Sequence, residues 1–184
     1  MATKIAIVYF SHGGNTKQIA TKVAEGVEQC DVQPTLFEIV GDDIQAGRYS
    51  KTEVFHELSE YDAILFGSPT YMGSAAAQFK AFMDASSDSY CKGIWRDKIA
   101  AGFTSGGSIN GEQQQTLLSF FVLANQHGML WAGLDTSVHV DELGLNRTGS
   151  SIGLVSSHDE NGQLHPNDLE TAHHFGKRIA LLVK

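Results

Sequence analysis

The stretch Lys4-Ile-Ala-Ile-Val-Tyr-Phe-Ser-His-Gly-Gly-Asn-Thr16 carries most of the information about the fold. Residues 4–10 form a continuous apolar run, which is typical of a strand buried on both faces of a sheet. From Thr16 to about Gln29, apolar residues recur at helical spacing, as in a helix that packs on a sheet. Residues 11–16 are small and polar, so we expect a tight loop that joins this strand to this helix.

The same alternation of a short apolar run and an amphipathic segment repeats along the chain. Further strands are predicted at 34–40, 61–67, 98–104 and 129–134, and helices at 74–86, 112–126 and 167–183, with a short one near 53–59. This pattern predicts an α/β fold, a three-layer sandwich in which helices cover both faces of a five-stranded parallel sheet. A polar excursion over 135–164 contains one apolar stretch, 152–156, that could return a strand to the sheet.

Composition and charge limit the classes of function. The 184 residues are the size of one domain, so we expect a single domain over 1–184. The net charge is −8 and the basic residues are scattered, which argues against a nucleic-acid partner. No apolar run reaches the ~20 residues that span a bilayer, and the N-terminus lacks a signal-peptide layout. We therefore expect a cytoplasmic protein without membrane insertion. Cys30 and Cys91 are far apart, which predicts free thiols and no metal site.

Three segments follow predicted strands and precede predicted helices, at 11–16, 68–73 and 104–111. In an open parallel sheet, ligands bind beyond the carboxyl ends of the strands, at the point where the strand order reverses. We therefore expect these three loops to lie at one edge of the sheet and to form one ligand site.

The first loop has the chemistry of a phosphate cradle. Adjacent glycines let backbone N–H groups turn inward, and the helix N-terminus adds the positive end of its dipole. The other common phosphate motifs, G-x-x-x-x-G-K-[ST] and G-x-G-x-x-G, do not occur. The simpler alternative is a tight turn before a capped helix. The residues of the cradle are Ser11, His12, Gly13, Gly14, Asn15 and Thr16.

The second and third loops suit a flat heterocycle. In Gly67-Ser-Pro-Thr-Tyr-Met-Gly73, a proline stiffens the backbone, and Thr70, Tyr71 and Met72 can contact the edge and face of a ring. The alternative for Tyr71 and Met72 is simple packing at the rim. In Thr104-Ser-Gly-Gly-Ser-Ile-Asn-Gly111, small residues leave open space beside a ring, as a substrate pocket requires.

At these residues the chain resembles the flavodoxin-like superfamily, and within it the WrbA-type NAD(P)H:quinone oxidoreductases and their NADPH-dependent FMN reductase relatives. The resemblance covers nearly the whole chain in the family's order. It is carried by Tyr9-Phe-Ser-His-Gly-Gly-Asn-Thr16, Gly67-Ser-Pro-Thr-Tyr-Met-Gly73, Phe79-Lys-Ala-Phe-Met-Asp84, Thr104-Ser-Gly-Gly-Ser108, Glu112-Gln-Gln-Gln-Thr116 and Gln126-His-Gly-Met129. It implies a flavodoxin-like sandwich that binds FMN, takes electrons from NADH or NADPH, passes them to a quinone-like acceptor and assembles as a homodimer or homotetramer.

The resemblance also implies a role for each loop. The first would hold the FMN phosphate. The second would lie along the pyrimidine edge and N5 of the flavin, and the third would border the ring. His127 would lie near the open face of the flavin, with a subunit contact as one way to bring it there, and could protonate a quinone oxygen. Its alternative is a packing or interface role. The implied ring contacts are Pro69, Thr70, Tyr71, Met72, Gly73, Thr104, Ser105, Gly106 and Gly107.

Two other functions are open on the sequence. A flavodoxin-type electron carrier would share the fold, because one scaffold hosts many functions. A serine hydrolase is suggested by Gly149-Ser-Ser-Ile-Gly153 with Asp168 and His173 following, but a nucleophile elbow leads into a helix and Ser151 precedes a strand-like run. Small residues in the third loop favour the enzyme over the carrier. The family's usual Arg-Phe is replaced by Tyr71-Met72, which bears on the preference for nicotinamide and quinone.

Overall fold

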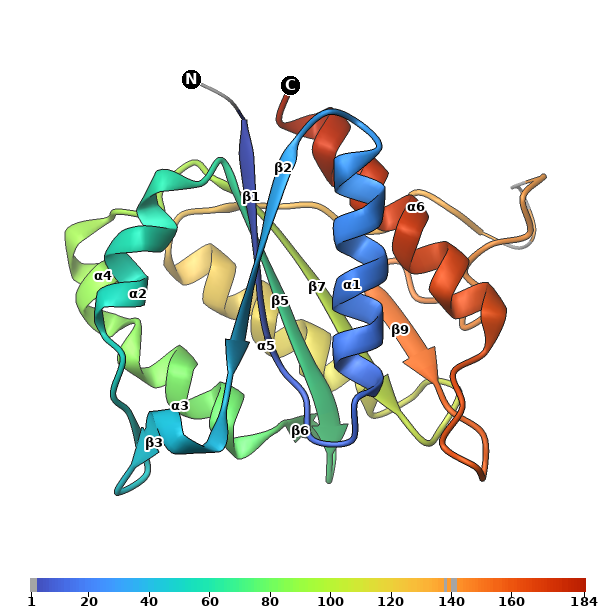
Figure 1. Ribbon diagram of the computed structural model, residues 1–184, viewed down its shortest axis with the longest axis horizontal. Helices are drawn as coiled ribbons and strands as arrows, with labels where there is room; N and C mark the ends of the chain where they lie inside the picture. Colours follow the sequence, from blue (N-terminus) through green and yellow to red (C-terminus); the bar gives the residue numbers. More distant parts are fainter. Residues whose placement is uncertain (1–2, 138, 140–141) are drawn as a thin grey trace.

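The computed structural model describes residues 3–137, 139 and 142–184, and its central layer is a parallel sheet (Figure 1). Four long strands lie side by side in the order β2 (Gln33–Ile39), β1 (Lys4–Phe10), β5 (Ala63–Tyr71) and β7 (Ile99–Gly106). β1 is an inner strand with β2 on one side and β5 on the other, so the chain moves outward from it in both directions, and the strand order reverses there. This is the doubly wound order of the flavodoxin-like fold, which confirms the predicted class.

The fifth strand of the sheet is split in two. β8 (Leu130–Trp131) pairs with the start of β7, and β9 (Leu154–Ser157) pairs with its end. The predicted strand over 129–134 is therefore too long, whereas the predicted return of a strand near 152–156 is confirmed. The segment that follows β8 touches the segment that leads into β9: a Cβ atom built on Gly133 would lie 2.3 Å from the Ser151 carbonyl oxygen. That crossing ends β8 early.

Helices cover both faces of the sheet, as predicted. α1 (Asn15–Glu28) and α6 (Pro166–Leu182) pack on one face. The other face carries α2 (Glu53–Glu57), α3 (Ala77–Ala85), α4 (Ser87–Lys92) and α5 (Gln113–Gln126). Short elements complete the chain: η1 (Gly41–Asp43), η2 (Leu58–Glu60) and strands β3 (Ile44–Gln45), β4 (Arg48–Tyr49) and β6 (Ser74–Ala75). None of the described helices is both long and apolar enough to cross a bilayer.

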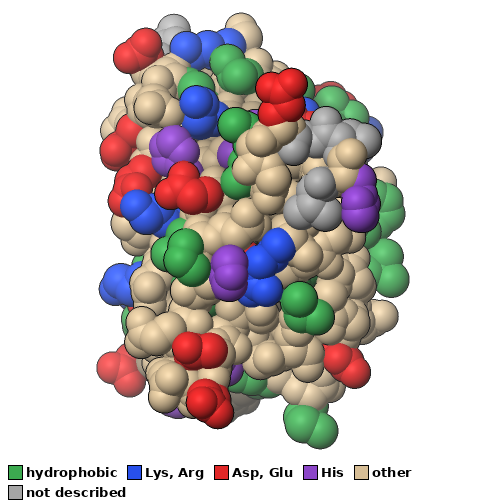
Figure 2. All heavy atoms as spheres, turned by 90° about the vertical axis from the view of Figure 1, so that its right-hand side faces the viewer, with side chains coloured by type: hydrophobic (Ala, Val, Ile, Leu, Met, Phe, Trp, Pro, Cys, Tyr) green, Lys and Arg blue, Asp and Glu red, His purple; other side chains and the backbone are tan. Residues whose placement is uncertain are grey.

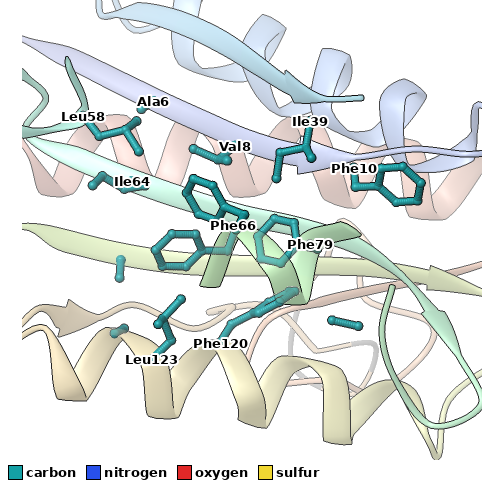
Figure 3. Packing of buried hydrophobic residues seen from close by; sticks show 14 of the residues in the cluster. Ala6, Val8, Phe10, Ile39, Leu58, Ile64, Phe66, Phe79, Phe120 and Leu123 are labelled. Carbon is teal, nitrogen blue, oxygen red and sulfur yellow. The ribbon is translucent and has the colours of Figure 1, made fainter. Parts of the chain in front are cut away.

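Two hydrophobic cores follow from the alternation of side chains along the strands. Along β1, Ile5 and Ile7 face α1 and α6, whereas Ala6 and Val8 face the other helices. Aromatic rings fill this second core. Phe66 from β5, Phe79 from α3 and Phe120 from α5 point toward one another (Figure 3), with 4.9 Å between the ring centroids of Phe79 and Phe120. These cores hold the carboxyl ends of the strands, and the loops after them, in place.

Helices α1 and α6 approach so closely that their backbones touch. A Cβ atom built on Gly26 would lie 2.0 Å from the carbonyl oxygen of His173, and one built on Gly176 would lie 2.0 Å from that of Val23. Glycine inside a helix normally lowers its stability. Here it permits the close contact of the two helices that cover one face of the sheet.

Candidate functional site

The structure brings the three predicted loops together at the carboxyl ends of β1, β5 and β7. The Oγ1 atom of Thr16, from the first loop, lies 3.0 Å from the Oγ of Ser105, from the third. The Oγ1 atom of Thr70, from the second, lies 2.8 Å from the Oγ1 atoms of Thr104 and Thr116. Buried hydroxyl groups therefore join all three segments, and Thr116 of α5 joins them as well.

The order of donors in the larger hydroxyl chain follows from its geometry. Thr104 donates its hydroxyl hydrogen to the Ser68 carbonyl oxygen at 2.7 Å. A threonine has one such hydrogen, so its Oγ1 must accept from Thr70. Thr70 has then used its own hydrogen and must accept from Thr116. The chain of donors runs from Thr116 through Thr70 and Thr104 to the backbone of β5, and it fixes the second loop relative to the third.

We expect the substitution Thr104→Val to lower the free energy of unfolding by about 1–3 kcal/mol, because it leaves buried oxygens without a partner. Chemical denaturation measures this directly. The matched control is Thr52→Val, since Thr52 is exposed and its side chain does not cap α2. Equal stability of Thr104→Val and the wild type would mean that the hydroxyl chain does not hold the site.

The first loop presents an open helix N-terminus. Helix α1 begins at Asn15 after Gly14, which has φ 91°, and no side chain caps it at Gly14. Its first turn carries no acidic residue, and Ser11 Oγ accepts from the N–H of Lys17 at 3.2 Å. Cβ atoms built on Gly13 and Gly14 would meet nothing within 4 Å, so there is room in front of these donors. The donor set and the space fit a phosphate group. His12 is exposed and Asn15 half-buried.

The second loop differs in shape from the prediction. Strand β5 continues through Pro69 and Thr70 to Tyr71, and only Met72 and Gly73 form the turn into β6. The strand is extended because Ser68 Oγ accepts from the N–H of Ala76 at 3.0 Å, which closes the hairpin. Helix α3 consequently starts at Ala77 and not at residue 74. Of the predicted contacts in this loop, Pro69 is buried and pairs with Ser105, Thr70 and Gly73 are half-buried, and Tyr71 and Met72 are exposed.

The third loop borders a cavity of about 420 Å³, a volume in the range of ligand pockets. Glycines form one wall. Gln113, at the start of α5, packs on Gly106: a Cβ atom built on Gly106 would lie 2.5 Å from Nε2 of Gln113. The residues around the cavity are Thr70, Met72, Gly73, Gly106, Gly107, Ser108, Glu112 and Gln113, and none of them is aromatic.

The structure does not bring His127 to this site. His127 directly follows the last residue of α5. Its neighbour Gly128 accepts a hydrogen bond, at its carbonyl oxygen, from the N–H of Asp97 at 2.9 Å, and Asp97 lies just before the start of β7. The loops lie at the other end of β7, eight residues and roughly 25 Å away. A role at the flavin within one chain is thus incompatible with the geometry. The expected helix at 112–126 and strand at 129–134 imply this distance, because in a parallel sheet the residue just before a strand lies at the edge opposite the ligand-binding loops.

The surroundings of His127 are those of a packing residue. Its ring is 4% exposed and stacks on Trp95 with 4.3 Å between the centroids. Ser86 Oγ donates to the Met83 carbonyl and lies 3.0 Å from His127 Nε2, so Nε2 carries the hydrogen. Nδ1 is buried and has no hydrogen-bond partner in residues 3–137, 139 and 142–184. Burial lowers the pKa of His127 to about 4, so the imidazole is neutral at pH 7.

This pKa predicts a dependence of stability on pH. The unfolded chain binds a proton at His127 near pH 6.5, whereas the folded chain does so only near pH 4. The free energy of unfolding should therefore fall as the pH drops from about 6.5 to 4, by up to about 3 kcal/mol from this residue. His127→Gln should flatten that slope in denaturation curves. His56→Gln, at an exposed histidine, should not, and an unchanged slope in His127→Gln would contradict the assignment.

Asp168, which the hydrolase alternative requires, is committed elsewhere. It lies 2.8 Å from Arg147 Nη2 and accepts from the N–H of Ser157 at 2.9 Å, which ties the excursion after β8 to β9 and α6. Ser151 precedes β9 and not a helix. The geometry thus does not support a hydrolase.

On the side of the molecule that carries β9 and α6, acidic, basic and histidine side chains are interspersed (Figure 2). Among the described residues, no cluster of His, Cys, Asp or Glu could hold a metal ion.

Three residues of the site, Glu112, Gln113 and Thr116, lie outside the predicted loops and were not predicted. All three belong to the stretch Glu112-Gln-Gln-Gln-Thr116, in which three glutamines are adjacent. The helical spacing from Gln113 to Leu117, Phe120 and Ala124 places it on the buried stripe of α5. That spacing could have singled it out among the three glutamines.

An α/β sandwich with three small-residue loops at the point where the strand order reverses defines a flavodoxin-like protein. Residues 3–139 match the family model described as NADPH-dependent FMN reductase. The chain belongs to this family. Its membership confirms the predicted cofactors, FMN and a reduced nicotinamide dinucleotide, and the predicted class, an oxidoreductase.

Individual relatives carry different names. A flavodoxin from Pseudomonas aeruginosa is 37% identical, over 97% of this chain and 95% of its own. A quinone oxidoreductase from Triphysaria versicolor is 32% identical, over 100% of this chain and 97% of its own. Among solved structures, a WrbA-like flavodoxin from Agrobacterium tumefaciens is 35% identical with a TM-score of 0.76, covering 99% of this chain and 98% of its own.

Proposed function

We propose that this protein is an FMN-dependent NAD(P)H:quinone oxidoreductase. The observation that carries the proposal is the cavity of about 420 Å³ between the β5–β6 hairpin and the third loop. The glycine residues and the short side chain of Ser108 leave room for a second flat molecule beside a bound ring, and none of the residues around the cavity is aromatic. The cytoplasmic location and the homodimer or homotetramer expected from the sequence remain part of this proposal.

Residues of the first loop would bind the FMN phosphate. The N–H groups at the start of α1 and the two glycines supply donors, and the helix dipole favours the negative charge. No lysine is required, since Lys17 pairs with Glu38 at 2.8 Å. Thr16 and Ser105 would support the cradle through their mutual hydrogen bond rather than through the phosphate itself.

The hairpin and the third loop would hold the ring. Tyr71 and Met72 project at the turn, and the hydroxyl chain through Thr70 keeps that turn at a constant distance from Gly106 and Gly107. When bound, FMN would supply hydride transfer: a hydride from NADH or NADPH would reach the quinone by way of the flavin, and a proton from solvent would complete the hydroquinone. The chain would contribute position and a preformed set of donors.

The first experiment is a visible spectrum of the purified protein, followed by turnover with NADH or NADPH and benzoquinone. We expect a yellow protein that oxidises at least one nucleotide in a quinone-dependent manner. A protein that binds FMN but oxidises neither nucleotide would contradict the proposed enzyme activity.

The cavity itself is tested by filling it. Ser108→Trp places a large ring at the cavity while the Ser108 carbonyl keeps its bond to Gln113. We expect kcat/KM for quinone to fall roughly tenfold or more, by exclusion of the acceptor, with FMN still bound. Ser87→Trp, at an exposed position of α4, is the matched control.

A second candidate is an electron carrier between proteins, which is favoured by the 37% identical relative named flavodoxin. A carrier moves single electrons, so stepwise reduction would accumulate the one-electron form of the flavin. Accumulation of that form, together with slow oxidation of both nucleotides, would select the carrier.

A further inference from the structure

One buried polar group belongs to a residue that lines the cavity and has no partner among the described residues. The Gln113 side chain is 2% exposed, and its Nε2 donates to the Ser108 carbonyl oxygen at 2.6 Å. Its Oε1 is buried and makes no hydrogen bond within the part of the chain that the structure describes. Buried side-chain carbonyl groups without a partner are uncommon, because their desolvation is not compensated. Such a group at a ligand cavity points to a donor on the ligand.

The orientation of this amide is determined by its surroundings. Exchanging its oxygen and nitrogen would place Oε1 against the Ser108 carbonyl oxygen, two acceptors with no hydrogen between them. The amide also has no freedom to slide, since it packs directly on Gly106. Oε1 is therefore held as an acceptor beside the cavity.

Two other side chains around the cavity also present acceptors. The hydroxyl hydrogen of Thr70 is donated to Thr104, and Glu112 has a carboxylate. These acceptors favour a ligand edge that carries a donor. A planar heterocycle with an N–H on its edge suits this wall.

We propose that Gln113 is a recognition residue for the flavin ring: its Oε1 accepts a hydrogen bond from the imide N–H of the pyrimidine edge, while its Nε2 keeps the third loop folded. This inference rests on the proposed function, because it requires FMN to bind at the three loops. It gives the flavin a side-chain partner on α5.

The test compares two flavins and three proteins. Protein stripped of flavin is titrated with FMN and with FMN methylated at the imide nitrogen, and binding is followed by flavin fluorescence. The proteins are the wild type, Gln113→Met and the matched control Gln115→Met, since Gln115 is exposed on the same helix. Thermal unfolding of each protein verifies that it is folded.

The wild type should bind FMN roughly tenfold more tightly than methylated FMN, the equivalent of one hydrogen bond. Gln113→Met should bind FMN about tenfold more weakly and lose this discrimination, because the acceptor is gone. Gln115→Met should behave as the wild type. Gln113→Glu keeps an acceptor but loses the bond to Ser108, so it should bind less tightly yet retain the discrimination.

Undiminished discrimination by folded Gln113→Met would overturn the inference and leave the proposed function intact. A Gln113→Met protein with unchanged FMN affinity and a raised KM for NADH or NADPH would also overturn the inference. That result would assign Oε1 to the nicotinamide amide instead. Wild-type protein that binds neither flavin would overturn both the inference and the proposed function.

Discussion

The Gly26→Ala variant should lose about 3 kcal/mol or more of its free energy of unfolding, even though alanine is the best helix former. In an isolated helix this change would stabilise by about 1 kcal/mol. Here the new Cβ would lie 2.0 Å from the carbonyl oxygen of His173, so α1 and α6 must move apart. The contact is with backbone, which cannot rotate away as a flexible side chain can.

Thermal denaturation should show the effect as a drop in melting temperature of roughly 6–12 °C. Gly176→Ala should behave alike, since its Cβ would meet the Val23 carbonyl oxygen at the same distance. The control is Gly41→Ala, where nothing lies within 4 Å and φ is not positive, so stability should stay equal or rise slightly. A Gly26→Ala protein that melts with the wild type would show that the two helices are not in backbone contact.

These glycines show how far the sequence specifies the fold. The buried strands and amphipathic helices were predictable, because each is a local pattern of apolar residues. The close helix crossing was not, since Gly26 alone does not reveal which segment will lie against it. The early end of β8 has the same origin, because it depends on Ser151, a residue about twenty positions away that the sequence pattern does not pair with Gly133.

The site was predictable in its location and only partly in its detail. Loops after β1, β5 and β7 meet because carboxyl ends of parallel strands share one edge. The extension of β5 through Tyr71 depends on a long-range bond between Ala76 and Ser68, which no local pattern reveals. The interpretation of His127 as a residue beside the flavin came from resemblance, and the path of α5 places that histidine at the opposite edge.

Asn15→Asp should act with opposite signs on stability and on cofactor binding. Asn15 is the first residue of α1, whose first turn has no acidic residue, so a carboxylate there should stabilise the helix by about 0.3–1 kcal/mol. The same carboxylate would face the phosphate of FMN. Repulsion between the two negative charges should weaken FMN binding by roughly tenfold to a hundredfold.

Riboflavin, which lacks the phosphate, distinguishes charge repulsion from damage to the loop. Its affinity for Asn15→Asp should equal that for the wild type, while the preference for FMN over riboflavin disappears. The matched control is Asn125→Asp in the last turn of α5, where a carboxylate meets the negative end of a helix dipole: it should lower the melting temperature slightly and leave FMN binding unchanged. Because the two variants add the same charge at opposite edges of the sheet, only local placement can explain a difference in FMN affinity between them. Equal FMN affinity of Asn15→Asp and the wild type would contradict the proposal that the first loop binds the FMN phosphate.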